Sequence, residues 1–453
     1  MPYTPHTEEE IREMLRLIGE DDLQNLFKTI PEEAILNAPL NLPPPVSEKE
    51  LVDHLTGLSR ETASVEDYTS FLGGGSYNHY IPSVVKHIIS RSEFYSAYTP
   101  YQPEISQGTL QAIFEFQTLI CQLTGMEVAN ASMYDGASAA AEAILMAKRI
   151  NKRPKVLLSS ALHPEYREVI RTYLSTEADN TREVLYCTEK GQTLPEAVEG
   201  IIDKETSALV VQHPNFFGCL EDIKSLGELA HKSGALLIVV ITEPLSLAIL
   251  KPPGKLMADI VVGDAQSFGI PPSFGGPSLG FFATLERYVR QMPGRVVGET
   301  LDNKGSKGYV LTLSTREQHI RRERSTSNIC TNEALCALAS TVYLSLLGKK
   351  GLRELAMVNL SKANYAKESL QGVKCVRQLF TAPTFNEFVV DLTVDPEGLF
   401  TYLKGKGVLG GIPLLRHYPN HKRSILITVT EANSKEDIDR LVREIETYGR
   451  MSR

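Results

Sequence analysis

Acidic and hydroxyl side chains stand next to buried segments at positions that favour chemistry. Glu243 follows the apolar run 235–241 and precedes Pro244. An acid at the carboxyl end of a strand can point into a cleft and pair with a protonated ring nitrogen. Ser132 and Asp135 precede an alanine-rich helical pattern, whose free backbone N–H groups could bind an anion. Each feature also has a simpler explanation, because acids often cap turns and Asp or Ser commonly begins a helix.

Two histidines follow apolar runs in the same way. His163 precedes Pro164, and His213 stands after the run 207–212. A histidine ring can stack on the face of a flat cofactor. A lone histidine is more often a structural residue with satisfied hydrogen bonds, and this interpretation is favoured for both.

Two loops are rich in glycine, tyrosine and amide side chains. Residues 72–80 read LGGGSYNHY and residues 95–104 read YSAYTPYQPE. Consecutive glycines permit backbone geometries that are closed to other residues, and loops of this kind often carry function. An aromatic cluster beneath a loop explains the same residues equally well. The residues that could line a binding site are Tyr77, Asn78, His79, Tyr95, Tyr98, Tyr101 and Gln102.

Gln266 stands in a strand–turn–strand stretch with a glycine- and proline-rich loop, over residues 259–283. In fold-type I pyridoxal-phosphate enzymes, a stretch of this kind carries the lysine that forms the Schiff base. That lysine is required because a primary amine must hold the aldehyde and later act as a base. Gln266 can do neither. A glycine-rich surface loop remains an equal alternative on these residues alone.

Apolar runs alternate with helical patterns between residues 61 and 330. Short apolar runs predict strands at 155–159, 207–212, 235–241, 259–262 and 280–283. Helical patterns lie around them at 109–123, 137–147, 163–174 and 223–231. Strands that are apolar on both faces and alternate with helices predict a mainly parallel sheet covered on both sides. We therefore expect a large α/β domain over residues 61–330.

Smaller regions flank this domain. Residues 1–60 predict a helical arm with a helix at 8–18, a proline-rich linker at 41–46, and a capping box formed by Ser47 and Glu50. Residues 331–453 predict a small C-terminal α+β domain. Its expected elements are a helix at 332–347 ended by Gly348, strands at 387–391 and 424–429, and a helix at 434–446.

Composition excludes several classes of protein. The net charge of −8 and the lack of a dense basic patch argue against nucleic-acid binding. No apolar run is long enough to cross a membrane, and the acidic start MPYTPHTEEEIREML is unlike a signal peptide. The six cysteines form no CxxC pair, so we expect reduced thiols, no metal site and a cytoplasmic location.

Taken together, the motifs resemble the glycine decarboxylase P-protein of the glycine cleavage system. The resemblance spans nearly the whole chain and is nearest to the amino-terminal half of the long single-chain form, which many bacteria make as a separate subunit. The motifs that carry it are YNHYIPSVV (77–85), EFYSAYTPYQPEISQGTLQAIFEFQTLICQLTGM (93–126), ASMYDGASAAAEA (131–143), HPEYREVIRTYL (163–174) and STREQHIRRERSTSNICTNEALCALASTVYLSLLG (314–348).

The resemblance implies a fold-type I transferase-like domain that no longer holds its cofactor. The Schiff-base lysine would belong to a second subunit, in a His-Lys-Thr-Phe core that aligns with residues 265–268 here. That subunit would hold pyridoxal 5′-phosphate covalently and join this chain in an α2β2 heterotetramer. The implied reaction decarboxylates glycine and passes the aminomethyl group to the lipoyl arm of H-protein. His163, Glu243, Gln266, Ser132 and Asp135 would then be remnants of a cofactor site, and the residues of the two tyrosine loops would line the partner's site.

Alternatives remain at this stage. The chain could be a purely structural scaffold subunit. It could also be an independent pyridoxal-phosphate enzyme with a displaced lysine, for which Lys251 and Lys255 are the nearest residues. Both lysines precede the strand at 259–262 rather than following it, which counts against that role.

Overall fold

The computed structural model describes residues 6–36 and 38–452. The chain divides into two units, residues 1–63 and 64–453. The first unit contains the helices α1 (Glu8–Ile18) and α2 (Glu48–Arg60). Thr7 and Ser47 begin these helices in capping boxes with Glu10 and Glu50, and each box satisfies N–H groups that the first turn leaves free. The predicted helix at 8–18 and the cap at Ser47 are confirmed.

A seven-stranded sheet forms the centre of the second unit, with strand order β2-β8-β7-β6-β5-β3-β4. The strands from β7 through β4 run parallel, and β8 is antiparallel to both of its neighbours. The mainly parallel sheet is therefore confirmed. The strands are β2 (Val128–Ala129), β3 (Lys155–Ser159), β4 (Thr181–Val184), β5 (Thr206–Gln212), β6 (Leu236–Ile241), β7 (Ile260–Asp264) and β8 (Gly280–Thr284).

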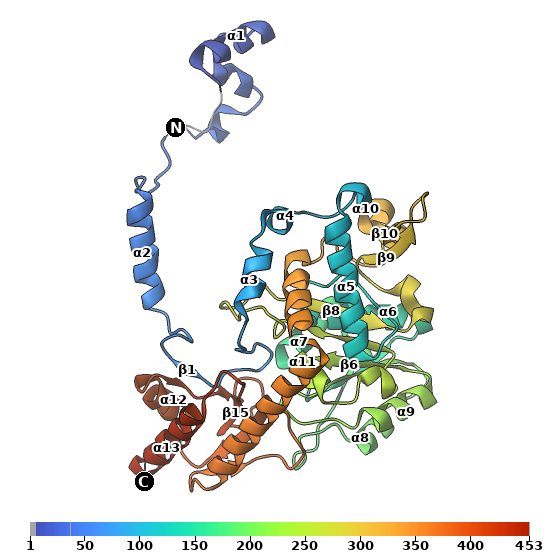
Figure 1. Ribbon diagram of the computed structural model, residues 1–453, viewed down its shortest axis with the longest axis vertical. Helices are drawn as coiled ribbons and strands as arrows, with labels where there is room; N and C mark the ends of the chain where they lie inside the picture. The colour runs from blue at the N-terminus through green and yellow to red at the C-terminus, as the bar shows by residue number, and fades with distance from the viewer. Residues whose placement is uncertain (1–5, 37, 453) are drawn as a thin grey trace. The chain divides into compact units, whose positions relative to one another are not determined.

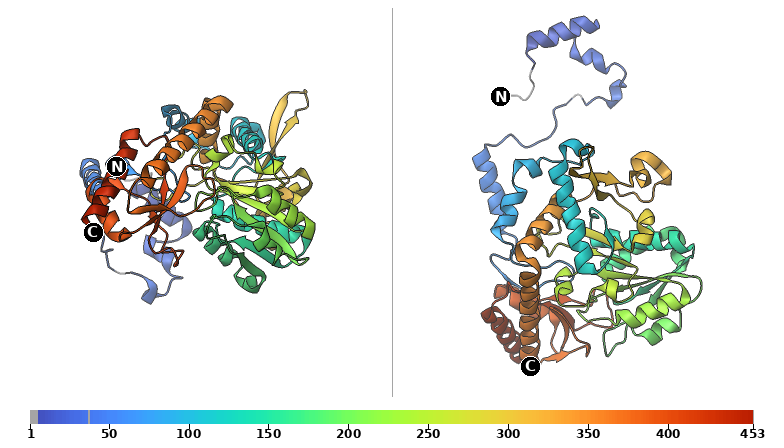
Figure 2. Two further views of the ribbon diagram at one scale, coloured as in Figure 1. Left: turned by 90° about the horizontal axis from the view of Figure 1, so that it is seen from below. Right: turned by 45° about the vertical axis from the view of Figure 1, so that its right-hand side comes forward.

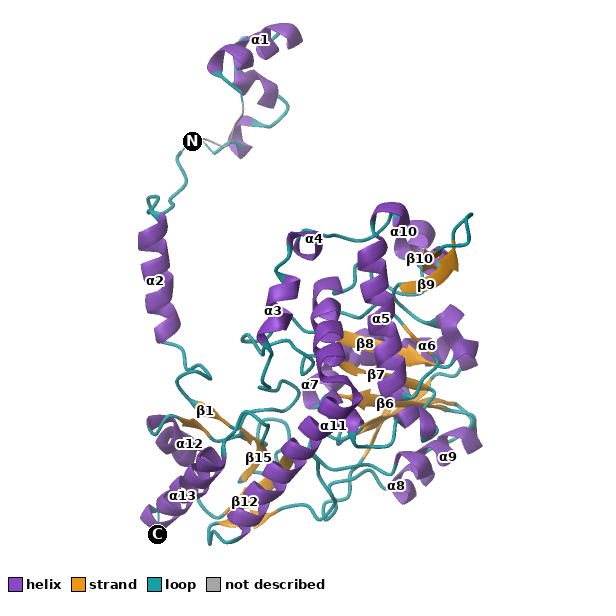
Figure 3. Ribbon diagram, in the orientation of Figure 1, coloured by secondary structure: helices purple, strands orange, loops and turns teal. Residues whose placement is uncertain are grey.

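Helices cover both faces of this sheet. Alternate residues of a strand point to opposite sides, so a strand that is apolar throughout needs a hydrophobic partner on each side. In β6, Leu237, Val239 and Ile241 join one hydrophobic cluster. Leu236, Ile238 and Val240 join another. The first cluster includes α5 (Gln107–Thr124), α9 (Ile223–Ser233) and α11 (Ala334–Gln371), and Figures 1 and 3 show α5 and α11 in front of the strands. The second cluster includes α6 (Gly136–Asn151) and α7 (Pro164–Tyr173).

A four-stranded antiparallel sheet organises the C-terminal part, with order β11-β12-β15-β14, and Figure 2 shows it beside the large sheet. Its strands are β11 (Val376–Gln378), β12 (Glu387–Leu392), β14 (Ile412–Pro413) and β15 (Ser424–Thr428). The helices α12 (Pro396–Gly405) and α13 (Lys435–Met451) pack on it. The expected strands at 387–391 and 424–429 and the final helix are confirmed.

Helix α11 connects the two parts of the second unit. Gly348 interrupts this helix with φ of +57°, a conformation that favours glycine. The helix expected to end at Gly348 therefore continues beyond it as a second helical segment. Buried residues of α11 up to Ala356 pack in the cluster on the large sheet, and later residues such as Ala363 and Leu370 pack in the C-terminal core. The short strand β1 (Thr69–Ser70) pairs with β13 (Val408–Leu409), and Phe71 also lies in the C-terminal core. The domain limits at 60 and 330 stay predictions.

Several shorter elements complete the second unit. A hairpin of β9 (Val296–Leu301) and β10 (Lys307–Thr312) was not anticipated, since neither strand alternates regularly between apolar and polar residues. The short helices are α3 (Ser83–Ile89), α4 (Ser92–Tyr95), α8 (Pro195–Glu199) and α10 (Gln318–Arg321). Within the described residues, no helix combines the length and the hydropathy that crossing a membrane requires.

Candidate functional site

The polar residues singled out in the sequence gather at one edge of the large sheet. Strands β3, β6 and β7 are parallel, so the residues that follow them share the carboxyl edge. His163 follows β3, Glu243 follows β6 and Gln266 follows β7. In open parallel sheets this edge is the usual place for a ligand. All three side chains are nevertheless buried, with exposed fractions of 7%, 2% and 6% in that order.

The Gln266 side chain is bonded to the chain's own backbone. Its Oε1 accepts a hydrogen bond from the Tyr77 N–H at 2.9 Å, and its Nε2 donates to the Tyr77 carbonyl at 3.1 Å. The same Nε2 also donates to the carbonyl of Ile270. An amide can accept and donate at once, whereas a lysine ammonium can only donate. Gln266 therefore anchors the glycine-rich segment 73–80 at the carboxyl edge.

His79 lies between two carboxylates in the same site. Its Nε2 is 3.0 Å from Oε2 of Glu243, and its Nδ1 is 2.8 Å from Oε2 of Glu431. Burial disfavours a charged ring, but the two carboxylates outweigh it and raise the pKa of His79 to about 10. Burial also opposes charge on Glu431, and bonding to His79 overcomes it, which lowers the pKa of Glu431 to about 2. The histidine is thus an imidazolium that donates from both nitrogens.

Tyr77 and Glu387 form a second buried pair. The Tyr77 hydroxyl donates to Oε2 of Glu387 at 2.7 Å. Oε1 of Glu387 accepts from the Gly74 N–H at 2.7 Å and from the Thr428 hydroxyl at 2.8 Å. Burial raises the pKa of Glu387 to about 7 despite these bonds. A Cβ on Gly73 would lie 2.0 Å from Oγ1 of Thr428, so only glycine fits there.

The helix start expected to hold an anion is occupied by the chain's own carboxylates. Asp135 caps α6 by accepting from the Ser138 N–H at 2.7 Å. The Gly136 N–H donates to Oδ2 of Asp264 at 3.2 Å, and burial raises the pKa of Asp264. Ser132 faces another partner, because its hydroxyl accepts from the Glu333 N–H at 2.9 Å. The structure therefore supports the simpler interpretation of Asp135 as a helix cap.

The remaining sequence candidates also have structural partners. His163 donates from Nε2 to the Gly74 carbonyl at 2.6 Å and accepts at Nδ1 from the Glu165 N–H at 3.2 Å. Burial lowers the pKa of His163, so the ring is neutral. His213 accepts from the Glu221 N–H at 3.0 Å, and burial lowers its pKa to about 4. Both rings are bonded to backbone groups of the same chain, and their roles stay predictions.

Glu243 fills two roles at the end of β6. Its Oε1 caps the following turn by accepting from the Leu245 N–H at 3.1 Å. Its Oε2 accepts from Asn386 Nδ2 at 3.1 Å and meets His79. The expected turn cap is therefore present. A retained acid at this position was expected to pair with a protonated ring nitrogen of a cofactor. In this chain the ring nitrogen beside Glu243 belongs to His79.

The residues at this edge do not fit pyridoxal phosphate. Gln266 offers no amine, carboxylates accept from the Gly136 and Ser138 N–H groups at the helix start, and the His79 ring lies beside Glu243. The alternative of a displaced lysine gains no support. Lys251 and Lys255 are exposed and precede β7, whereas Gln266 follows its far end.

Relatives of known family share this chain's full length. The family model described as Glycine cleavage system P-protein matches residues 1–445. The chain belongs to the P-protein family of the glycine cleavage system. A probable glycine dehydrogenase (decarboxylating) subunit 1 from Desulfitobacterium hafniense is 52% identical over 442 residues, which cover 98% of both chains.

Solved structures agree with this family. A crystal structure of glycine decarboxylase (P-protein) of the glycine cleavage system, in inhibitor-bound form, matches with a TM-score of 0.91 at 46% identity. The match covers 99% of this chain and 100% of that one. A sphingosine-1-phosphate lyase from Burkholderia pseudomallei matches with a TM-score of 0.66 at 16% identity, which shows the fold alone. The predicted fold-type I architecture is confirmed.

The two tyrosine loops of this P-protein family member differ sharply in exposure. Tyr77 and His79 are turned into the chain's own site, and Asn78 is half-buried with its carbonyl bonded to Thr430. In the second loop the side chains face outward. Tyr95, Tyr98 and Tyr101 are 71%, 76% and 53% exposed, and Gln102 is exposed as well.

Sequence reasoning missed Arg295, which ties the second tyrosine loop to the 314–348 motif. Its guanidinium is 2% exposed and donates to Tyr101 Oη at 2.9 Å, to Thr99 Oγ1 at 3.3 Å and to Glu317 Oε2 at 3.3 Å. Arginine suits this role because its planar fork reaches several acceptors at once. The one available signal was that Tyr101 and Glu317 both lie in motifs, while Arg295 lies between them.

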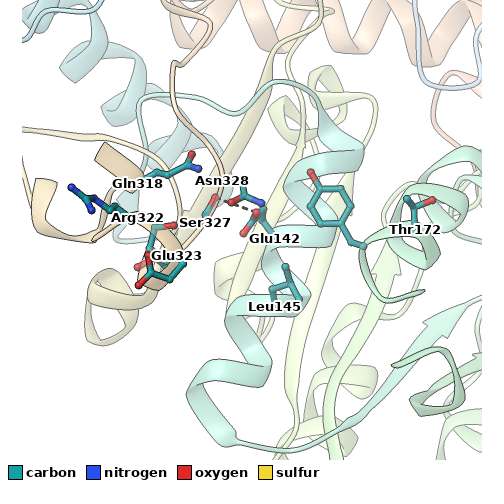
Figure 4. Close-up of a pocket in the computed structure, with 11 residues that line it drawn as sticks. Glu142, Leu145, Thr172, Gln318, Arg322, Glu323, Ser327 and Asn328 are labelled. Atoms are coloured by element: carbon teal, nitrogen blue, oxygen red, sulfur yellow. Dashed lines mark hydrogen bonds between the residues drawn. The ribbon is translucent and has the colours of Figure 1, made fainter. Parts of the chain in front are cut away.

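A surface pocket also borders the 314–348 motif (Figure 4). Figure 4 shows Glu142 of α6 facing Ser327, whose hydroxyl donates to Oε1 of Glu142 at 3.1 Å. Burial raises the pKa of Glu142. The other lining residues include Gln318, Arg322 and Asn328, and none of the residues around Gln266 takes part. The pocket is therefore separate from the carboxyl-edge site.

Proposed function

We propose that this chain is the subunit of glycine dehydrogenase (aminomethyl-transferring) that lacks the cofactor lysine. With a lysine-bearing subunit it forms an α2β2 heterotetramer that decarboxylates glycine and passes the aminomethyl group to the lipoyl arm of H-protein. Relatives named subunit 1 of glycine dehydrogenase support a divided enzyme. The observation that carries the proposal is the bonding of Gln266 to Tyr77, which leaves no amine at the Schiff-base position.

In this proposal the partner subunit holds pyridoxal phosphate covalently. The fold of this chain is shared with enzymes that use the cofactor. Its own carboxyl-edge site does not fit the group, so the cofactor of the enzyme is assigned to the other chain. We place the assembly in the cytoplasm, because six cysteines without a CxxC pair suit a reducing compartment.

This chain contributes walls to the partner's site through the exposed loop of Tyr95, Tyr98, Tyr101 and Gln102. Exposed tyrosines combine a rigid apolar ring with a hydrogen-bonding hydroxyl, a combination enriched at protein interfaces. The loop is also firmly mounted, since the buried Arg295 donates to Tyr101. A rigid mounting is what positioning of a substrate requires.

Reconstitution tests the proposal. This chain and the lysine-bearing subunit are expressed separately and together, and glycine–bicarbonate exchange is measured with lipoylated H-protein. We expect exchange only when both chains are present. Exchange by this chain alone would show that it is an independent enzyme.

A substitution separates a contributing subunit from a scaffold. Tyr98→Phe removes one exposed hydroxyl, and Tyr173→Phe is the matched control on another exposed tyrosine, 41% exposed on α7. If the loop lines the partner's site, Tyr98→Phe lowers exchange by about tenfold in an intact tetramer, the upper end of the net value of a neutral hydrogen bond. Unchanged exchange in Tyr98→Phe and in the matching Tyr95→Phe would favour a scaffold.

A further inference from the structure

We propose that residues 73–80 act as a built-in replacement for a cofactor. The segment fills the site at the carboxyl edge and joins the two parts of the second unit, so that the site stays closed to pyridoxal phosphate even when a lysine is restored at position 266. This inference concerns the chain's own site and does not depend on the function proposed above.

The contacts of the segment are those of a bound ligand. Gln266 bonds both the N–H and the carbonyl of Tyr77, in the way an amide recognises a peptide group. The Gly74 carbonyl accepts from His163 Nε2 at 2.6 Å, and the Tyr80 N–H donates to Glu431 Oε1 at 2.7 Å. The bonded groups of the segment are thus backbone groups of Gly74, Tyr77 and Tyr80 and the side chains of Tyr77 and His79, and buried polar groups require such partners.

The segment links elements that are far apart in the sequence. Gln266 and Glu243 follow strands β7 and β6 of the large sheet, whereas Glu387 lies in β12 and Glu431 follows β15 in the C-terminal part. His79 bridges Glu243 to Glu431, and Tyr77 bridges Gln266 to Glu387. A group bound between the two parts could supply such links only while it stayed bound. Here the links are covalently part of the chain.

The charges at the site also disfavour binding of a phosphate group. Glu243 and Glu431 already share the one imidazolium of His79. Asp135 and Asp264 take the N–H groups at the start of α6, where an anion would otherwise be stabilised. A phosphate brought to this edge would face buried carboxylates, and the imidazolium of His79 is already paired with two of them. Repulsion of like charges in a buried site is costly.

The closure is tested by restoring the lysine. Native chain, Gln266→Lys and Gln266→Met are each purified in the complex with the lysine-bearing partner, treated with excess pyridoxal phosphate and reduced with borohydride. Peptide mapping then separates position 266 from exposed lysines such as Lys251. We expect the partner to carry the adduct in all three samples and position 266 to carry less than about a tenth of that occupancy. Full labelling at position 266 in Gln266→Lys would overturn the proposal, while a missing adduct on the partner would count against the proposed function alone.

A second measurement needs no substitution. Amide hydrogen exchange is followed in the native chain for residues 73–80 and for residues 95–102, most of which are exposed. If the first segment is bound within the site, its amides exchange about a hundredfold or more slower than those of the second, since buried hydrogen-bonded amides open rarely. Equal exchange in the two loops would show that residues 73–80 leave the site readily, and the proposal would fail even if Gln266→Lys could not be assembled.

Discussion

Replacing His79 by alanine should destabilise the second unit strongly. The substitution removes the one cation between two buried carboxylates, since Glu243 is 2% exposed and the Glu431 side chain is 11% exposed. Removing one partner of a buried ion pair costs about 3–5 kcal/mol. Asn386 still donates to Glu243 and Asn359 still donates to Glu431 in the variant. These bonds keep both carboxylates partly satisfied, so the loss of unfolding free energy should stay within that range. For roughly 400 residues that unfold together, this lowers the melting temperature by about 4–6 °C.

The loss should also depend on pH, and its sign follows from the raised pKa of His79. The pKa rises from 6.5 unfolded to about 10 folded, so the contribution is complete below about pH 6.5 and is lost as pH rises through about 10. Glu431 has its pKa lowered from 4.5 to about 2, so its contribution is complete above about pH 4.5. The stability difference between native chain and variant should therefore peak between about pH 4.5 and 6.5 and shrink toward pH 10.

Thermal unfolding by calorimetry or circular dichroism at pH 6, 8 and 10 measures this difference. His87→Ala is the matched control, because His87 is an exposed histidine on α3. The control should melt within about 1 °C of the native chain, as most surface substitutions do. If His79→Ala also melts within that margin, or if its deficit does not change with pH, the imidazolium does not hold the two carboxylates together.

Three further substitutions follow from the same contacts. Gly73→Ala places a Cβ 2.0 Å from Thr428 Oγ1 and should cost about 1–3 kcal/mol in urea unfolding; an unchanged midpoint would mean that the segment lies elsewhere. The raised pKa of Glu387 means that its protonated form favours folding, so the native chain should lose stability as pH rises from about 4.5 to about 7. Glu387→Gln cannot ionise and should not show this loss. Melting curves across that pH range check the difference. Arg295→Lys keeps the charge but loses the planar fork that holds Tyr101, so exchange activity of the assembled enzyme should fall about tenfold to a hundredfold while assembly persists; full activity would contradict the positioning role.

Much of the fold could be predicted because its signals are local. The apolar runs that became β3, β5, β6 and β7 are buried on both faces, and such runs between helical patterns indicate a parallel sheet. The cap at Ser47 was likewise predictable, because its partner Glu50 stands three residues further along the chain. The β9–β10 hairpin was missed because only Val296, Val297 and Tyr309 of its strands are buried and the strands carry no apolar alternation.

The filled site could not be predicted because its contacts are distant in sequence. Tyr77 and Gln266 are 189 residues apart, and His79 and Glu431 are 352 residues apart. Nothing in the spacing of these residues links them, and Glu387 and Glu431 drew no notice as buried acids. The three consecutive glycines at 73–75 were the one local signal, and they indicated an unusual backbone without indicating where it lies.

The location of the cofactor decides which of the two chains forms the Schiff base. The active complex of this chain and its lysine-bearing partner is reduced with borohydride, and the intact masses of both chains are measured. We expect one pyridoxyl adduct on the partner and none on this chain, in which Gln266 is bonded to Tyr77. A stoichiometric adduct on this chain would contradict this expectation.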